Sequence, residues 1–176
     1  MVGNKGTHYE KAFAALLQCR DTPYIALDQK RKAIFSGAQL KSFDFIVSPG
    51  CPKRFLIDVK GRKLPFDSFN RGNLGQNWVT TADIEGLIQW EEVFGPEYLA
   101  VFVFAYWLTE PPLTVLSPNV FQYQNRDYFF VAVQVSSYRI QMRPRSSSWK
   151  TVSVLSRTFR HLAQPYDRFI SESGCP

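Results

Sequence analysis

Apolar residues near the N-terminus recur every three or four positions, the spacing of one helix face. Thr7 lies before this run and Glu10 follows Thr7 by three positions, which is the separation of a capping box. We therefore expect the helix to span residues 7–19. The apolar stripe on its predicted face consists of Tyr9, Ala12, Phe13, Leu16 and Leu17.

A second helical pattern begins at residue 80, where Thr80 and Asp83 repeat the capping separation. The pattern ends at Gly95 and Pro96, a pair that does not continue a helix. The positions that outline the predicted helix are Ile84, Leu87, Ile88, Glu91 and Phe94.

Runs rich in β-branched and aromatic residues predict strands near residues 24–27, 33–36, 42–47, 55–60 and 98–106. The third and fourth of these are joined by a short segment containing Pro49 and Gly50, which is typical of a hairpin loop, so we expect antiparallel neighbours. The strand at 98–106 follows a helix, and such a crossover favours a parallel arrangement with an earlier strand.

The remaining segments carry weaker patterns. Residues 61–76 are polar and glycine-containing, which predicts a mobile surface loop. Farther on we expect a hairpin of strands at 128–135 and 138–142, a loop at 145–148 and a short final helix at 156–163. We therefore expect one domain over residues 1–176, with a core at about 7–106 and a β-rich C-terminal extension at 107–176.

Two of the predicted buried strands contain a carboxylate where an apolar residue would be expected, at Asp44 and Asp58. Burying an ionised carboxylate is unfavourable unless it is paired or binds a metal, so the two residues suggest a cation site. The period of two along a strand places Asp58 and Lys60 on one face. The alternative is a solvent-facing acid and amine with no further role.

The balance of charge favours a polyanionic partner only weakly. The chain has 21 Lys and Arg against 15 Asp and Glu, and many basic proteins bind no nucleic acid. The distribution is more informative, because residues 128–166 contain no acid but six basic residues. Such a stretch is typical of a surface that follows phosphates, although a solvated face explains it equally well.

Cys19, Cys51 and Cys175 lack the paired spacing of a zinc site, and we expect reduced thiols in a cytoplasmic protein. The apolar run at 98–108 is too short to span a bilayer, so no membrane partner is expected.

The order helix, strands, carboxylate strand, carboxylate-x-Lys strand, helix and strand resembles the PD-(D/E)XK nuclease superfamily. This superfamily has the restriction-endonuclease-like fold and includes Holliday junction resolvases and repair nucleases. The resemblance covers about residues 7–106 and rests on Glu10, Asp44 and the tripeptide Asp58-Val59-Lys60. It implies an α/β fold with an αβββαβ core, in which a mixed central sheet is flanked by helices, and a C-terminal β elaboration.

The resemblance also implies a metal-dependent nuclease. Asp44, Asp58 and the Val59 carbonyl would bind Mg²⁺ or Mn²⁺, with Glu10 helping to hold it or capping its own helix. Lys60 would orient the attacking water or stabilise charge on the phosphate. Gln89 is expected in solvent, and Trp78 and Trp90 in the core. Nucleic-acid contacts are expected from Arg62, Lys63, Arg71, Arg143, Arg145 and Lys150.

The predicted function is hydrolysis of phosphodiester bonds in nucleic acid, most simply DNA. One alternative is a nucleic-acid-binding module of the same fold without catalysis, and another is a structural or partner-binding domain whose acids are incidental. The sequence leaves open whether the chain forms a homodimer, whether it prefers DNA or RNA, and which nucleic-acid structure it recognises.

Overall fold

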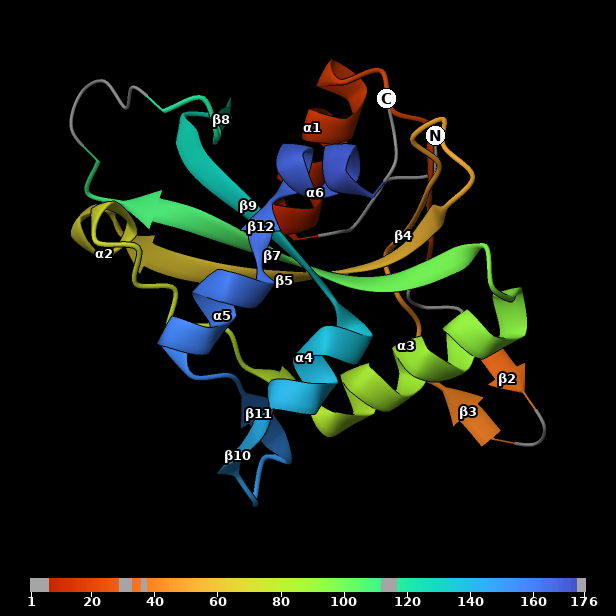
Figure 1. The fold of residues 1–176 in the computed structure, drawn as a ribbon. Helices are drawn as coiled ribbons and strands as arrows, with labels where there is room; N and C mark the ends of the chain where they lie inside the picture. Colours follow the sequence, from red (N-terminus) through yellow and green to blue (C-terminus); the bar gives the residue numbers. More distant parts are fainter. Residues whose placement is uncertain (1–6, 29–32, 36–37, 112–116, 174–176) are drawn as a thin grey trace.

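The computed structural model describes residues 7–28, 33–35, 38–111 and 117–173. Its main sheet has seven strands, and six of them follow one another in the order β1, β4, β5, β7, β9 and β12, with β8 added against β9 (Figure 1). The strands are β1 (Tyr24–Ala26), β4 (Phe45–Val47), β5 (Arg54–Pro65), β7 (Tyr98–Thr109), β8 (Val120–Tyr123), β9 (Arg126–Gln134) and β12 (Gln164–Pro165).

The centre of the sheet is formed by β5 and β7, which run parallel and pair residue by residue from Arg54 and Tyr98 to Pro65 and Thr109. Helix α3 (Thr81–Phe94) is part of the crossover between them, as the sequence pattern predicts. Strand β4 lies antiparallel on the other side of β5, which confirms the predicted hairpin. The sheet is therefore mixed.

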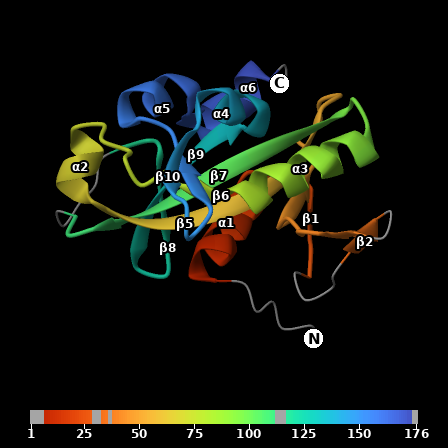
Figure 2. The same cartoon turned by 90° about the horizontal axis from the view of Figure 1, so that it is seen from below.

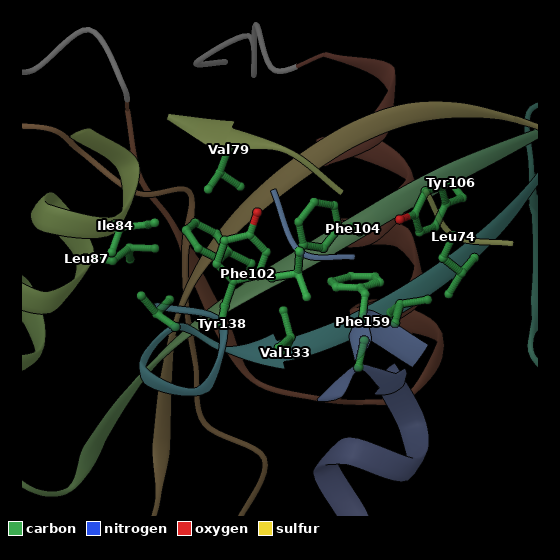
Figure 3. Packing of buried hydrophobic residues seen from close by; sticks show 14 of the residues in the cluster. Leu74, Val79, Ile84, Leu87, Phe102, Phe104, Tyr106, Val133, Tyr138 and Phe159 are labelled. Atoms are coloured by element: carbon green, nitrogen blue, oxygen red, sulfur yellow. The ribbon is translucent and has the colours of Figure 1, made fainter. Parts of the chain in front are cut away.

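Helices cover both faces of this sheet (Figure 1). On one face, α1 (His8–Cys19) buries Phe13 and Leu17 against the sheet, and α6 (Tyr166–Glu172) adds Tyr166 beside Phe13. The other face is covered by α3, α4 (Val135–Gln141) and α5 (Ser156–Leu162). Figure 3 shows the packing on this second face, where Tyr138 and Phe159 lie over Phe102 and Phe104 of β7.

Two small sheets accompany the main one. Strands β2 (Ala33–Phe35) and β3 (Ala38–Leu40) form a hairpin. Strands β10 (Arg143–Ser146) and β11 (Thr151–Ser153) form another, and β11 also pairs with β6 (Val79–Thr80) just before α3. In Figure 2, which views the molecule from below, the β10–β11 hairpin lies near β6 and the start of α3, with β11 as the strand that pairs with β6.

The predicted hairpin at 128–142 is wrong in its second half. Strand β9 ends at Gln134, and the next seven residues form helix α4. Val135 and Tyr138 are three positions apart and both are buried, whereas Ile140 is exposed. This is the burial pattern of a helix. The apolar pattern spans too few residues for a helical period to be recognised in the sequence. With α5 and α6, the C-terminal part thus adds helices as well as strands.

The predicted loop at 61–76 is also wrong in part. Strand β5 continues through Pro65, because β7 supplies a backbone partner for each of its residues, and α2 (Phe66–Asn70) follows directly. The expectation of reduced thiols is wrong for Cys51, which is disulfide-bonded, whereas Cys19 is free and exposed. Within the described residues, no helix is long and apolar enough to cross a membrane.

A buried asparagine fastens the segment before β6 to the residue that follows strand β11. The Asn77 side-chain amide donates to the carbonyls of Leu74 and Val154 at 3.1 and 3.0 Å, and its oxygen accepts from the Val154 N–H at 2.9 Å. The Tyr138 hydroxyl donates to the Asn77 carbonyl at 2.8 Å. These hydrogen bonds give partners to buried backbone groups, which are unfavourable when they are left unpaired.

We therefore predict that Asn77→Ala lowers the free energy of unfolding by about 2–4 kcal/mol, because it leaves several buried polar groups unpaired. The matched control is Asn73→Ala, four positions away, because the Asn73 side chain is exposed and accepts a hydrogen bond from the Ser156 hydroxyl. Denaturant titration of both variants measures the difference. Equal unfolding free energies would contradict the structural role of Asn77.

Candidate active site at the fork between two strands

The candidate site lies where β4 separates from β5. Their pairing covers only Phe55–Ile57 of β5, and Asp44 lies immediately before β4. The Asp44 N–H donates to the Ile57 carbonyl at 2.9 Å, and the Asp44 carboxylate accepts from the Val59 N–H at 2.6 Å. The side chain thus extends the ladder by one hydrogen bond after the backbone of β4 has left it.

Strand β5 next presents Asp58 and Lys60 on the face covered by α3. Asp58 is only 6% exposed, and its Oδ2 atom lies 2.8 Å from the Lys60 ammonium. Lys60 also lies 5.9 Å from the centre of the Phe102 ring on the neighbouring strand. The prediction that Asp58 and Lys60 share one face is therefore confirmed. The alternative, in which the acid faces solvent, is excluded because Asp58 is buried.

Helix α3 contributes a third buried acid, Asp83, whose Oδ1 atom lies 3.0 Å from the Lys60 ammonium. Lys41 contacts the same oxygen, and the Oδ2 atom accepts from the Thr80 N–H at 2.8 Å. The sequence predicts only the capping role of Asp83. The capping signal places Asp83 in the first turn of a helix that packs over β5. Nothing in the sequence indicates which residue of β5 Asp83 contacts.

The charges in this group depend on one another. Burial, followed by the nearby charges of Asp44 and Asp83, raises the pKa of Asp58 to about 7, although Lys60 opposes the change. Burial disfavours the Lys60 ammonium, but Asp58 and Asp83 outweigh it and raise the pKa of Lys60. Burial also works against ionised Asp83, yet Lys60, Lys41 and the Thr80 hydrogen bond lower its pKa to about 2. Lys60 is therefore protonated at neutral pH.

Glu10 lies in the first turn of α1 and is half-buried. Its carboxylate accepts from the backbone N–H and the hydroxyl of Thr7, both at 3.2 Å, so the predicted cap is confirmed. Burial raises the pKa of Glu10, the Thr7 hydrogen bonds lower it, and the negative charge of Asp58 raises it further. Glu10 is thus electrostatically coupled to the site while it also caps its helix.

The side chains present fit a cation with several water ligands. Within the described residues, no three His, Cys, Asp or Glu side chains are grouped so that they could hold a metal ion. Asp44 and Asp58 nevertheless bring two buried carboxylates close enough for each charge to affect the other. Mg²⁺ is commonly bound by one or two carboxylates and retains several waters, so this donor set is sufficient.

The predicted nucleic-acid contacts occupy several places. The Arg62 guanidinium lies 3.9 Å from the centre of the Trp78 ring and donates to the Gly61 and Trp78 carbonyls, so it is engaged within the fold. Lys63 is exposed on the opposite face of β5 and lies 5.2 Å from the Trp107 ring. Exposed basic residues on other elements are Arg71 after α2, Arg143 and Arg145 on β10, and Lys150 in the turn before β11.

Three further expectations have clear outcomes. Gln89 is exposed, as predicted. Trp90 packs against the core, and its indole N–H donates to the Lys41 carbonyl at 2.9 Å. Trp78 differs from the prediction, because it is half-buried between cations: Arg145 lies 5.3 Å from the ring that Arg62 also contacts. The Trp78 ring therefore links strand β5 to strand β10.

The mixed sheet flanked by helices has the restriction-endonuclease-like architecture, the fold of PD-(D/E)XK nucleases, with Asp44 immediately before β4 and the tripeptide Asp58-Val59-Lys60 on β5. A solved structure with a similar fold is that of Hjc, a Holliday junction resolvase of the archaeal hyperthermophile Archaeoglobus fulgidus. The TM-score is 0.54 at 14% sequence identity, over 93% of this chain and 98% of Hjc.

The likeness to Hjc confirms the predicted fold class and the resemblance to the PD-(D/E)XK superfamily at the level of the fold. No protein-family model and no curated protein matches the sequence.

The raised pKa of Asp58 predicts a pH dependence of stability in metal-free protein. Because the pKa is about 7 in the fold against an ordinary value of 3.8, the contribution of Asp58 is fully present below about pH 4 and is lost as the pH rises toward 7. Asp58→Asn removes this loss. We predict that the melting temperature of Asp58→Asn, relative to wild type, is higher at about pH 8 than at about pH 5.

The exposed Glu85 on α3 provides the control, because Glu85→Gln also removes one carboxylate charge. Its melting temperature relative to wild type should change little over the same pH range. The prediction is contradicted if the melting temperature of Asp58→Asn, relative to wild type, stays constant or falls as the pH rises. Burial would then not destabilise the ionised form of Asp58.

Proposed function

We propose that this protein is a metal-dependent nuclease that hydrolyses phosphodiester bonds of DNA. The observation that carries the proposal is the convergence of Asp44, Asp58 and Lys60 at the fork between β4 and β5. The fold shared with a Holliday junction resolvase supports DNA as the substrate. The excess of 21 Lys and Arg over 15 Asp and Glu is consistent with a polyanionic ligand.

Asp44 and Asp58 would hold one Mg²⁺ or Mn²⁺, with the Val59 carbonyl as a neutral ligand and Glu10 contributing directly or through water. When bound, the metal ion supplies positive charge that offsets the charge of the phosphate and favours deprotonation of the attacking water. Asp44 has a second task, because its carboxylate also accepts the Val59 N–H. This hydrogen bond orients the carboxylate toward the strand that carries Asp58.

Lys60 would stabilise the negative charge that develops on the phosphate during hydrolysis. Its raised pKa keeps it protonated, so it is better suited to electrostatic stabilisation and to orienting water than to removing a proton. Asp83 is a positioning residue in this account, since it holds the Lys60 ammonium from the side of α3. Lys41 shares Asp83, and this leaves Lys60 less tightly neutralised.

The cytoplasmic location expected from the sequence stays a prediction. The disulfide bond of Cys51 is a feature more typical of oxidising compartments. Formation of a homodimer also stays a prediction.

The central experiment separates metal binding from catalysis. We predict that Asp58→Asn and Asp44→Asn each abolish Mn²⁺ binding measured by calorimetry. Asparagine is preferred to alanine at residue 44 because its amide oxygen can still accept the Val59 N–H. Lys60→Met should retain Mn²⁺ binding and lower the rate of DNA cleavage by about 100-fold or more, because it loses only the ammonium.

The control is Lys11→Met, because the Lys11 side chain is exposed on α1 and the change also removes one ammonium group. It should cleave at a rate much closer to that of wild type. Wild-type cleavage by Lys60→Met would show that the active site has been misplaced. Salt-sensitive DNA binding without cleavage by wild type would favour a non-catalytic module, and neither binding nor cleavage would favour a structural domain.

A further inference from the structure

The turn between β10 and β11 presents a tryptophan to solvent. The Trp149 residue is 78% exposed, although it lies in an ordered turn. Its backbone N–H donates to the Ser146 hydroxyl at 3.3 Å, and the Lys150 N–H donates to the Ser147 carbonyl at 3.2 Å. The turn therefore fixes the backbone that carries the indole, while the side chain contributes little to the core.

The turn of this hairpin and the start of β11 are fastened to the element that carries Asp83. The Lys150 carbonyl accepts from the N–H of Thr81, the first residue of α3, at 3.0 Å. In the same small sheet, Thr151 pairs with Thr80, whose hydroxyl accepts from the Asp83 N–H at 3.1 Å. Together with the Asn77 hydrogen bonds, these contacts hold the hairpin at a defined position relative to Lys60.

Positive charge continues from the candidate active site to the hairpin. Arg62 follows Lys60 by two residues on the same face of β5, and the Trp78 ring joins Arg62 to Arg145. Three basic residues are exposed on the hairpin, which carries no acidic residue over 143–153: Arg143, Arg145 and Lys150. Trp149 lies in the turn between Arg145 and Lys150, adjacent to these basic residues in the chain.

We propose that the β10–β11 hairpin recognises an unpaired base of the DNA substrate. Arg145 and Lys150 contact phosphates between the active site and the turn, and the Trp149 indole stacks on a base that has no partner strand. In a duplex the base faces are already stacked on their neighbours, so an exposed indole gains most from a single-stranded segment. The inference rests on the proposed nuclease function and assigns its substrate class as duplex DNA that adjoins unpaired bases.

Binding experiments without divalent metal test this inference directly. In an Asp58→Asn background, fluorescence anisotropy compares a labelled blunt duplex with the same duplex carrying a short oligo-dT tail. Trp149→Ala should weaken binding of the tailed duplex by about tenfold and change binding of the blunt duplex by no more than about twofold. Trp149→Phe should retain most of the affinity for the tailed duplex, because phenylalanine keeps an aromatic face.

Ile25→Ala is the matched control, because Ile25 is also an exposed apolar residue, at 61%, but lies on the edge strand β1. It should bind both probes as the parent does. Equal losses for the two probes in Trp149→Ala would show a general contact in place of base stacking. No loss for either probe would remove the hairpin from the binding surface. Both outcomes overturn the inference.

The outcome is independent of cleavage. A wild-type protein that cleaves no DNA, while Trp149 still distinguishes the tailed from the blunt duplex, would reject the nuclease and retain the recognition element. Metal-dependent cleavage, together with a Trp149→Ala variant that binds both probes normally, would retain the nuclease and reject the assigned substrate class.

Discussion

The hydrogen bond from the Val59 N–H to the Asp44 carboxylate holds the candidate site together. At 2.6 Å it replaces the backbone acceptor that β4 no longer supplies after Phe45 pairs with Ile57. A strand edge whose partner ends would otherwise leave a buried donor unpaired, which is unfavourable. Because a side chain supplies the acceptor, the end of the pairing also places the Asp44 carboxylate close enough to Asp58 to affect its charge, and this fork is where we propose that a cation binds.

The cost of this arrangement is electrostatic. Asp44, Asp58 and Asp83 are all buried, and Lys60 and Lys41 provide positive charge beside Asp58 and Asp83. The pKa of Asp58 is nevertheless raised, because burial and the negative charges of Asp44 and Asp83 disfavour its ionised form, and a proton or a divalent cation would offset this cost. Such an arrangement requires a scaffold that keeps its shape, and the continuous pairing of β5 with β7 on the opposite side of the strand provides one. The stable pairing at the centre of the sheet thus offsets the cost of burying carboxylates at the fork between β4 and β5.

The sequence predicts the residues whose pattern is local. Alternation along β5 reveals Asp58 and Lys60 as one face, and the capping pairs locate the starts of α1 and α3. Asp83 illustrates the limit, because its contact with Lys60 depends on how α3 crosses the sheet. Arg62 illustrates the same limit. Its polar sequence segment predicts a solvent-exposed loop, but the pairing of β5 with β7 continues through this residue, and its guanidinium lies over the Trp78 ring. Helix α4 escapes notice because two buried positions are too few to establish a period.

The most direct test of the account is the location of a bound metal ion in crystals soaked with Mn²⁺. Anomalous scattering identifies manganese without reference to any assumed ligand. One principal peak is expected within coordinating distance of the Asp44 and Asp58 carboxylates, at the fork between β4 and β5. A peak that contacts neither carboxylate, or crystals that bind no manganese while both carboxylates remain accessible, would contradict the central claim that this fork is a metal site.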